Sequence, residues 1–552
     1  MLINATSGRL YNKSEQAAAF ESLPVFTELI ASMTTHIDHA RIEQEVAEYY
    51  RYATFSHKWE DKEPLFEKVK HIVVYDLEES PTHDKLQTFC KIVRDAGFHW
   101  AWSDTCCINK ADHFVLQEAL VAMFKWYEGS SLTIVFLRGV RSPSQRGDLV
   151  GSTWNTRAWT FQEYHASKVV QFYNEDWTLY MNLDIPNHKE SPEIISEMEE
   201  ATRISAQALM ALRPGLDDIR EKLCLASRRE TTLVEDTAYS LLGIFSASLP
   251  VMYGEGDKAL GRLLAQLLTS SGETSILAWT GRPGKFNSCL PVDTTVFSQL
   301  PTTHIPPAIE GAKLETITSR LQTSRSNLDL FMKLFDRLDG LPAPLFVGKR
   351  MKLPCITFKL GSVSASRSRS EHVFRAQTAA LGIVEIRTKE DLCQLKSLYL
   401  IHPWIDFLLD RKPVGSIVPA EGTDDLSVSI GELPSSPGPF NIGTSETKQT
   451  RTSRLATRLR LPFGRRPATS FRDVASLQPP SSISQVDRQM QAHHVIARLR
   501  QPFGALLFTP TRQNFKEYRR VASESMITVQ VGEITPEILR KLVDSVDTLD
   551  VL

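Results

Sequence analysis

Short apolar segments alternate with an amphipathic one along residues 98–137, FHWAWSDTCCINKADHFVLQEALVAMFKWYEGSSLTIVFL. Residues 98–103 are rich in aromatic side chains and predict a strand, and the apolar residues 132–137 predict a second one. Between them, apolar side chains recur at helical spacing: Leu116, Leu120, Met123 and Tyr127. Asp112 is placed to cap this helix, and Gly129 is placed to end it.

The same alternation continues upstream of this stretch. Residues 52–56 predict a strand, and residues 85–95 predict a helix that ends at Gly97. Strands that alternate with helices are typical of an α/β layer built on a parallel sheet. We therefore expect an α/β domain over residues 1–175, with a mostly parallel sheet and flanking helices.

Further along the chain the sequence pattern changes four times. Residues 176–275 predict a helical region with four helices, at 196–212, 216–228, 235–245 and 258–268. Residues 276–420 have the composition of a β-rich domain, most clearly at 353–360, 371–377 and 381–388. Residues 421–485 are rich in Ser, Pro, Thr and Gly and contain a basic run, which predicts a disordered insertion. Residues 486–552 predict strands and a helix that complete the β-rich domain.

Bulk composition limits the class of protein. The 552 residues carry a net charge of −2, so the chain as a whole has no signature of nucleic-acid binding. The seven cysteines are sparse and odd in number, which favours reduced thiols rather than a disulfide framework. We find no secretory signal at the N-terminus, no apolar stretch of membrane-spanning length and no cysteine spacing typical of a metal site. A cytoplasmic protein without a membrane span is expected.

Polar side chains follow two of the predicted strands. Ser56 and His57 come at the end of the first strand, and Asp104 comes just after the strand at 98–103. The carboxyl ends of parallel strands line the crevice in which ligands usually bind, so these three side chains are candidate binding residues. The alternative is structural: Ser56 and Asp104 would cap the next helices, and His57 would bridge two loops.

Four blocks of sequence occur in order and carry a family resemblance: YATFSHKW at 52–59, WSDTCCINK at 102–110, AMFKWY at 122–127 and RAWTFQE at 157–163. They resemble the blocks of the fungal heterokaryon-incompatibility (HET) domain. The flanks LINAT at 2–6 and EDTAYSLLGI at 235–244 resemble the basidiomycete branch of that family. The resemblance implies self/non-self recognition (vegetative incompatibility) and a cell-death signalling effector that acts through an incompatibility partner or self-association.

The HET family is thought to be distantly related to Toll/interleukin-receptor (TIR) domains. The resemblance therefore implies a flavodoxin-like fold and, as an alternative function, NAD glycohydrolase activity, with NAD as a substrate and no resident cofactor predicted. The candidate catalytic residues are Glu163 and His57, chosen from the residues themselves, and Glu118, as a substitute for the glutamate that the family carries in this helix. Two positions depart from the pattern, because Val115 stands where many relatives have a glutamate and Asn109 replaces a common aspartate. Glu118 is the nearest acidic residue, about one helical turn further on.

The fourth block places a cation, an amide and a carboxylate close together. In the functional interpretation, Arg157 and Gln162 bind the ligand with Ser56 and Asp104, while Glu163 stabilises a ribosyl cation or binds a ribose hydroxyl. In the structural interpretation, Arg157 and Glu163 form a buried ion pair that fixes the loop to the sheet. We favour the functional interpretation, because a rigid polar cluster beside a strand-end crevice is costly unless it is used.

Overall fold

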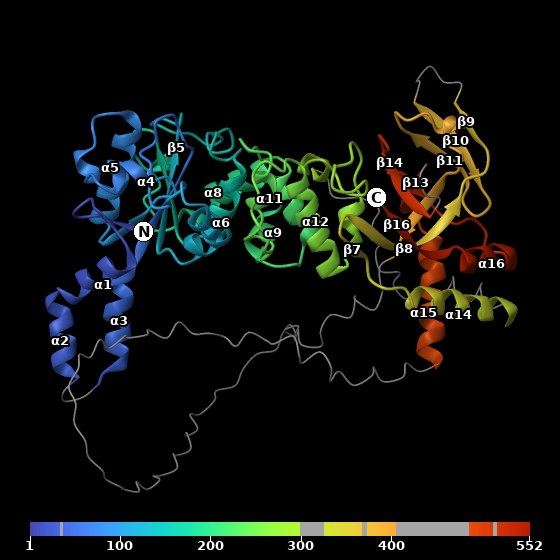
Figure 1. The fold of residues 1–552 in the computed structure, drawn as a ribbon, viewed down its shortest axis with the longest axis horizontal. Helices are drawn as coiled ribbons and strands as arrows, with labels where there is room; N and C mark the ends of the chain where they lie inside the picture. Colours follow the sequence, from blue (N-terminus) through green and yellow to red (C-terminus); the bar gives the residue numbers. More distant parts are fainter. Residues whose placement is uncertain (34–36, 299–324, 367–371, 405–484, 512–515) are drawn as a thin grey trace, which may run out of the picture. The chain divides into compact units, whose positions relative to one another are not determined.

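The computed structural model describes residues 1–552 except 34–36, 299–324, 367–371, 405–484 and 512–515 (Figure 1). Residues 1–406 and 489–552 form one compact unit. The fold is mixed α/β and contains a partly parallel sheet. The predicted disordered insertion at 421–485 lies almost entirely outside the described residues.

A six-stranded sheet organises the first part of the chain. Its strand order is β2-β1-β4-β3-β5-β6, with strands β1 Leu2–Asn4, β2 Leu10–Tyr11, β3 Tyr52–His57, β4 Trp100–Trp102, β5 Leu132–Leu137 and β6 Val170–Asn174. Strands β3 to β6 pair in parallel, whereas β1 is antiparallel to both of its neighbours. All six residues of β5 are buried, as expected of an apolar strand in the middle of a parallel sheet.

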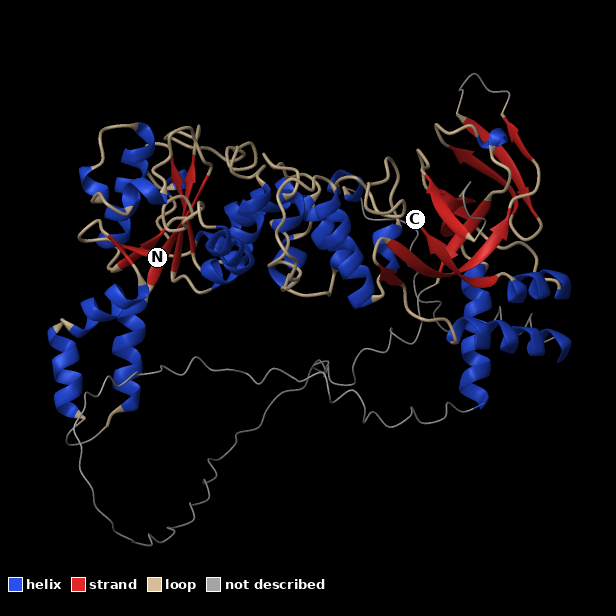
Figure 2. Cartoon of the chain, in the orientation of Figure 1, coloured by secondary structure: helices blue, strands red, loops and turns tan. Residues whose placement is uncertain are grey.

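Helices cover this sheet on both sides, with α4 and α5 on one side and α6 and α8 on the other (Figures 1 and 2). The helices before β6 are α1 Lys13–Glu21, α2 Pro24–Ser32, α3 His39–Tyr50, α4 Phe66–Val69, α5 Pro81–Asp95, α6 His113–Glu128 and α7 Ala158–Ala166. Helix α6 begins and ends as predicted. The Asp112 carboxylate accepts a hydrogen bond from the Phe114 amide at 2.9 Å, and Gly129 is the C-cap.

The strands predicted around the sheet were also correct in place, with small changes at their ends. Helix α5 starts four residues earlier than predicted, because Pro81 occupies the first helical turn and Ser80 caps it. The antiparallel strands β1 and β2 and the helices α1 to α3 were not predicted. Two- and three-residue strands carry too little periodicity to be recognised in sequence.

The helical region contains α8 Pro192–Thr202, α9 Ala206–Ala211, α10 Ile219–Ala226, α11 Asp236–Tyr239 and α12 Lys258–Ser271. The single helix predicted at 196–212 was wrong: Arg203 adopts a left-handed conformation with φ of 58°, and this ends α8 before α9 begins. The helix predicted at 235–245 was too long, since only α11 is helical and the chain then continues through turns.

Residues after 344 build two further sheets. The strands are β7 Leu345–Val347, β8 Arg350–Lys359, β9 Val363–Ala365, β10 Val373–Thr378, β11 Gly382–Arg387, β12 Tyr399–Pro403, β13 Phe503–Pro510, β14 Glu517–Val521, β15 Ile527–Val529 and β16 Val546–Val551. Strands β9, β10 and β11 form a three-stranded sheet. In the larger sheet, β12 pairs with both β13 and β8, so the path β12-β13-β14-β16-β8 closes on itself.

The remaining helices are α14 Arg325–Asp339, α15 Gln485–Leu499 and α16 Pro536–Asp544, which lie beside these strands (Figure 2). Arg520 of β14 is buried and donates hydrogen bonds to the carbonyls of Leu277 and Trp279, at 2.8 and 2.6 Å. In this way the last strands are joined to the segment that follows the helical region. Within the described residues, no helix is both long and apolar enough to cross a bilayer.

Candidate functional site

The carboxyl end of β3 is occupied by a buried serine–glutamate pair. The Ser56 hydroxyl donates to the Glu163 carboxylate at 2.5 Å and accepts a hydrogen bond from the Trp154 indole at 2.7 Å. Relative exposure is 0% for Ser56 and 8% for Glu163. The pairing brings together two predicted site residues that lie 107 positions apart in the sequence.

Burial sets the acidity of this carboxyl group. Burial raises the pKa of Glu163 most, the Asp104 charge raises it further, and the Ser56 hydrogen bond, Arg157 and Arg229 lower it. The net result is a pKa of about 7. Glu163 therefore exchanges a proton near neutral pH, which an exposed glutamate does not do.

His57 points away from this pair, toward a buried ion pair on the other side of β3. Its Nε2 lies 3.6 Å from the Glu63 carboxylate, which is too long for a hydrogen bond. Neither ring nitrogen has a hydrogen-bond partner among the described residues. Burial and then the nearby Lys85 ammonium lower the pKa of His57, whereas the Glu63 and Asp104 carboxylates act in the opposite direction.

Glu63 and Lys85 are nearly inaccessible, with side-chain exposures of 4% and 3%. The Lys85 ammonium donates to the Glu63 carboxylate and lies 3.6 Å from Glu60. Burial alone raises the pKa of Glu63, but the contacts with His57 and Lys85 outweigh burial and bring it to about 2. The carboxylate therefore stays ionised and paired with Lys85.

Asp104 is partly exposed and is held by an aromatic side chain. Both of its carboxylate oxygens accept from the Trp59 indole, at 3.2 and 3.0 Å. The Lys110 ammonium lies 3.2 Å from the centre of the Trp59 ring. Burial lowers the pKa of Lys110, and Asp104 acts in the opposite direction. Asp104 thus belongs to a half-buried cluster with Trp59 and Lys110, and among the described residues it caps no helix.

Arg157 anchors the loop before α7 to the end of β3. Its guanidinium donates to the His57 carbonyl at 3.0 Å, and its own carbonyl accepts from Arg229 at 3.1 Å. Within the described residues, Arg157 and Glu163 form no ion pair, so the alternative of a direct Arg157–Glu163 pair is wrong. The two side chains influence each other only through the electrostatic effect of Arg157 on the Glu163 pKa.

Gln162 and Glu118 lie away from this cluster. Gln162 is buried, and its side-chain oxygen lies next to Gly243 in the turns after α11. Glu118 is exposed on α6, whose buried residues are Ala119, Leu120, Met123, Phe124 and Tyr127. The structure therefore brings Ser56, Glu163 and Arg157 together around the end of β3 and leaves Glu118 in solvent.

Sequence reasoning did not identify four residues that complete these clusters: Trp59, Glu63, Lys85 and Trp154. One of them had a detectable signal. Lys85 lies four residues before Phe89 and eight before Val93, on the apolar face of α5, where a lysine is unexpected unless it is paired. Glu63 and Trp154 lie in irregular segments, where no periodicity indicates which side chains turn inward.

Comparison with known proteins identifies the class to which this fold and site belong. Residues 52–147 match the family model described as "Heterokaryon incompatibility protein (HET)", so this segment of the chain carries a HET domain. It is 33% identical over 236 residues to "Vegetative incompatibility protein HET-E-1" of Podospora anserina. This alignment covers 40% of the chain and 16% of that relative, so the chain matches a small part of the relative's length. No solved structure matches.

Proposed function

We propose that this HET-domain protein acts in vegetative incompatibility, as a cell-death effector that signals through contact with a protein partner or with a second copy of itself. The observation that carries the proposal is the HET match over residues 52–147, which include Ser56, His57 and Asp104. The similarity to a vegetative incompatibility protein supports the same role.

The arrangement of the polar side chains favours signalling over chemistry. Ser56 and Glu163 are buried and bonded to each other, and Arg157 is bonded to the main chain of His57. A ligand could reach Ser56 and Glu163 only after this packing had opened. Such a network rigidifies the sheet end and the loop before α7, as expected of a module that passes on a change of conformation or assembly.

An exposed apolar patch on α6 supports contact with a protein. Phe114 is 86% exposed and its neighbour Val115 is 39% exposed, at the start of the helix that follows Asp104. Large apolar side chains held in water at a helix end favour burial against another protein surface. Because both side chains point away from the core, their replacement changes the patch without disturbing the fold.

The test is inducible expression of the full chain in a filamentous fungus, with cell viability and NAD content followed together. We expect death on induction, intact NAD at its onset, and loss of killing in Phe114→Ser. Glu118→Gln is the matched control on the same helix, because Glu118 is exposed and polar to begin with. Viable cells at high levels of folded protein would refute the effector role, and unchanged killing by Phe114→Ser would refute the patch.

The strand order supports a TIR-like, flavodoxin-like core as the finer classification. Counted from β3 in chain order, the parallel strands β4-β3-β5-β6 follow the spatial order 2-1-3-4, which is how the flavodoxin-like sheet begins. In such sheets the ligand crevice lies between the first and third strands, which here are β3 and β5. Ser56 and His57 end the first of these strands.

A second candidate function, hydrolysis of NAD to nicotinamide and ADP-ribose with water as nucleophile, is favoured by one observation. Glu163 has a pKa of about 7 and contacts a serine at the end of β3, and carboxyl groups tuned in this way are common in catalytic sites. If this function holds, induction depletes NAD before death, and Glu163→Gln abolishes both effects while the folded protein accumulates normally. Intact NAD in dying cells would exclude it.

A further inference from the structure

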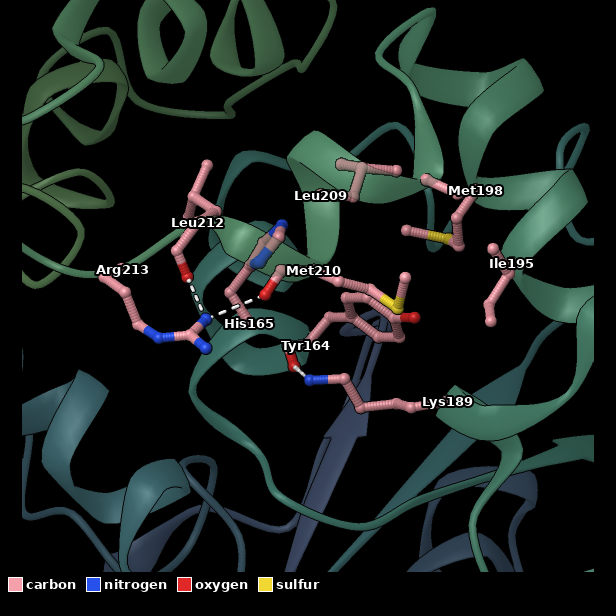
Figure 3. A pocket seen from close by; sticks show the side chains of 10 residues that line it. Tyr164, His165, Lys189, Ile195, Met198, Leu209, Met210, Leu212 and Arg213 are labelled. Carbon is pink, nitrogen blue, oxygen red and sulfur yellow. Dashed lines mark hydrogen bonds between the residues drawn. The ribbon is translucent and has the colours of Figure 1, made fainter. Parts of the chain in front are cut away.

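A cavity of about 230 Å³ lies between α7, α8 and α9 (Figure 3). Tyr164 and His165, which directly follow Glu163 in α7, form part of its wall. None of the predicted site residues lines it. The cavity is therefore separate from the candidate site at the end of β3.

Two basic side chains border this cavity. Lys189 donates to the carbonyls of Tyr164 and Ser167, at 3.0 and 2.8 Å, and so is fixed at the C-terminal end of α7. One Arg213 nitrogen donates to the carbonyls of Met210 and Leu212, at 2.8 and 3.0 Å, which leaves its other nitrogens available (Figure 3). No aspartate or glutamate is among the described residues that line the cavity.

No carboxylate among the described lining residues balances the positive charge around the cavity. Burial lowers the pKa of Lys189 to about 8, and Arg213 lowers it as well. Burial, Lys189 and Arg229 together hold the pKa of His165 well below its usual range. These groups destabilise one another's charged forms, so an anion placed among them would relieve the repulsion.

Two neutral polar groups also face the cavity. Among the described residues, no hydrogen-bond partner contacts the Tyr164 hydroxyl or the ring nitrogens of His165. Both side chains can donate or accept a hydrogen bond. They supply the few convergent polar groups that typically fix a ligand's orientation in a pocket.

The rest of the wall is apolar and faces the ring of Tyr164. Ile195 and Met198 of α8 lie on one side, and Leu209 and Met210 of α9 lie above the ring (Figure 3). An apolar cavity of about 150 Å³ is enough to take up benzene, so the present volume accommodates one aromatic ring together with a small charged group.

We propose that this cavity is a binding site for a small amphipathic anion, with a carboxylate or phosphate group held near Lys189 and Arg213 and a compact apolar body held by Tyr164 and the side chains of α8 and α9. The site does not depend on the proposed signalling function. It adds a small-molecule input at residues 164–213, outside the residues 52–147 that match the HET family. Because Glu163, Tyr164 and His165 are consecutive in α7, a bound ligand contacts the helix that carries the buried carboxylate.

Titration calorimetry on the purified full chain tests this proposal with four probes. Benzoate and phenyl phosphate combine a charge with a ring, benzamide keeps the ring without the charge, and inorganic phosphate keeps the charge without the ring. We expect saturable binding of benzoate or phenyl phosphate. Benzamide should bind about tenfold or more weakly than benzoate, because it lacks the negative charge. Inorganic phosphate should bind about tenfold or more weakly than phenyl phosphate, because it lacks the aromatic ring.

Two variants locate the binding site, and a third is a control. Arg213 is exposed, so Arg213→Gln removes the charge without burying a new polar group, and it should weaken benzoate binding about tenfold. Ala206→Met fills the cavity from the start of α9 and should abolish binding while the melting temperature is maintained. Arg203→Gln removes a cation that lines a neighbouring cavity instead and should leave binding unchanged.

Four results would overturn the proposal. They are equal binding of benzoate and benzamide, equal binding of phenyl phosphate and inorganic phosphate, no saturable binding of any probe, and loss of binding in Arg203→Gln rather than in Arg213→Gln. Because binding is measured on purified protein, failure here leaves the cell-death proposal untouched. Failure of the induction experiment likewise says nothing about ligand binding in this cavity, so failure of one proposal can be distinguished from failure of the other.

Discussion

Replacement of Lys85 by methionine tests whether the buried ion pair beside β3 holds the HET module together. Methionine keeps most of the apolar stem of lysine and removes only the ammonium group. The change leaves the Glu63 carboxylate, which is 4% exposed, without the cation that contacts it. Removal of one partner from a buried pair costs about 3–5 kcal/mol, because the remaining charge is neither solvated nor neutralised.

The pKa of Glu63 gives an independent magnitude. It lies at about 2 instead of the ordinary 4.5, and each pKa unit corresponds to about 1.36 kcal/mol, so the ionised carboxylate contributes about 3 kcal/mol near neutral pH through its contacts with His57 and Lys85 together, which sets an upper limit for the share of Lys85. Because the folded-state pKa is lowered, this stability is present above the ordinary pKa and is lost as the pH falls toward 2. At about pH 3 less than half of it remains.

The assay is urea unfolding of the full chain, followed by near-UV circular dichroism, at neutral pH and at about pH 3. We expect Lys85→Met to lose about 3 kcal/mol at neutral pH and less in acid. Lys91→Met is the matched control, since Lys91 is exposed on the same helix and its loss should cost less than about 0.5 kcal/mol. The double variant Lys85→Met with Glu63→Gln should recover part of the loss, because no charge is then left buried.

Two results would refute this reasoning. A loss in Lys85→Met no larger than in Lys91→Met would mean that the ion pair contributes nothing. A loss that does not shrink in acid would mean that packing of the lysine stem, and not the charge of Glu63, is responsible.

Three further predictions concern separate features. Since the pKa of Glu163 is raised to about 7, its ionised form destabilises the fold at higher pH, so Glu163→Gln should stabilise the chain by about 3 kcal/mol at about pH 8 and by less than about 1 kcal/mol at about pH 5 in urea unfolding. A Cβ on Gly243 would lie 2.3 Å from Phe124, so Gly243→Ala should lower the free energy of unfolding by about 1–3 kcal/mol. At Gly151 the nearest atom to an added Cβ lies 3.6 Å away, so Gly151→Ala should leave stability unchanged in the same urea unfolding assay. Arg520→Gln removes the buried hydrogen bonds to two carbonyls, and we expect a loss of about 2 kcal/mol or more by thermal unfolding; no change in melting temperature would contradict this.

The core of the fold could be predicted because its signals are local. Helix α6 is predicted by Asp112 at one end, Gly129 at the other and apolar side chains at helical spacing between them. Strand β5 is a continuous apolar run, which is how a strand buried on both faces appears in sequence. The break at Arg203 could not be predicted, because no glycine or proline marks this left-handed residue.

The candidate site was predictable in part. Residue type and position at a strand end were enough to select Ser56 and Asp104, because parallel strands end at a common edge. Glu163 was selected instead from the fourth block of the family resemblance, where it lies close to Arg157. Glu118 was selected only for its place in α6, and the side chain lies in solvent because its helical phase turns it away from the core.

The sequence by itself determined the α/β class of the first domain and the HET match of residues 52–147, since alternating periodicity and ordered motifs are properties of the linear chain. Only the tertiary structure decided which polar groups face each other. Ser56 contacts Glu163, which lies 107 positions away in the sequence. His57, the residue after Ser56, points instead to the Glu63–Lys85 pair. Successive side chains of a strand turn to opposite faces, so neighbours in sequence enter different clusters whose partners come from distant segments.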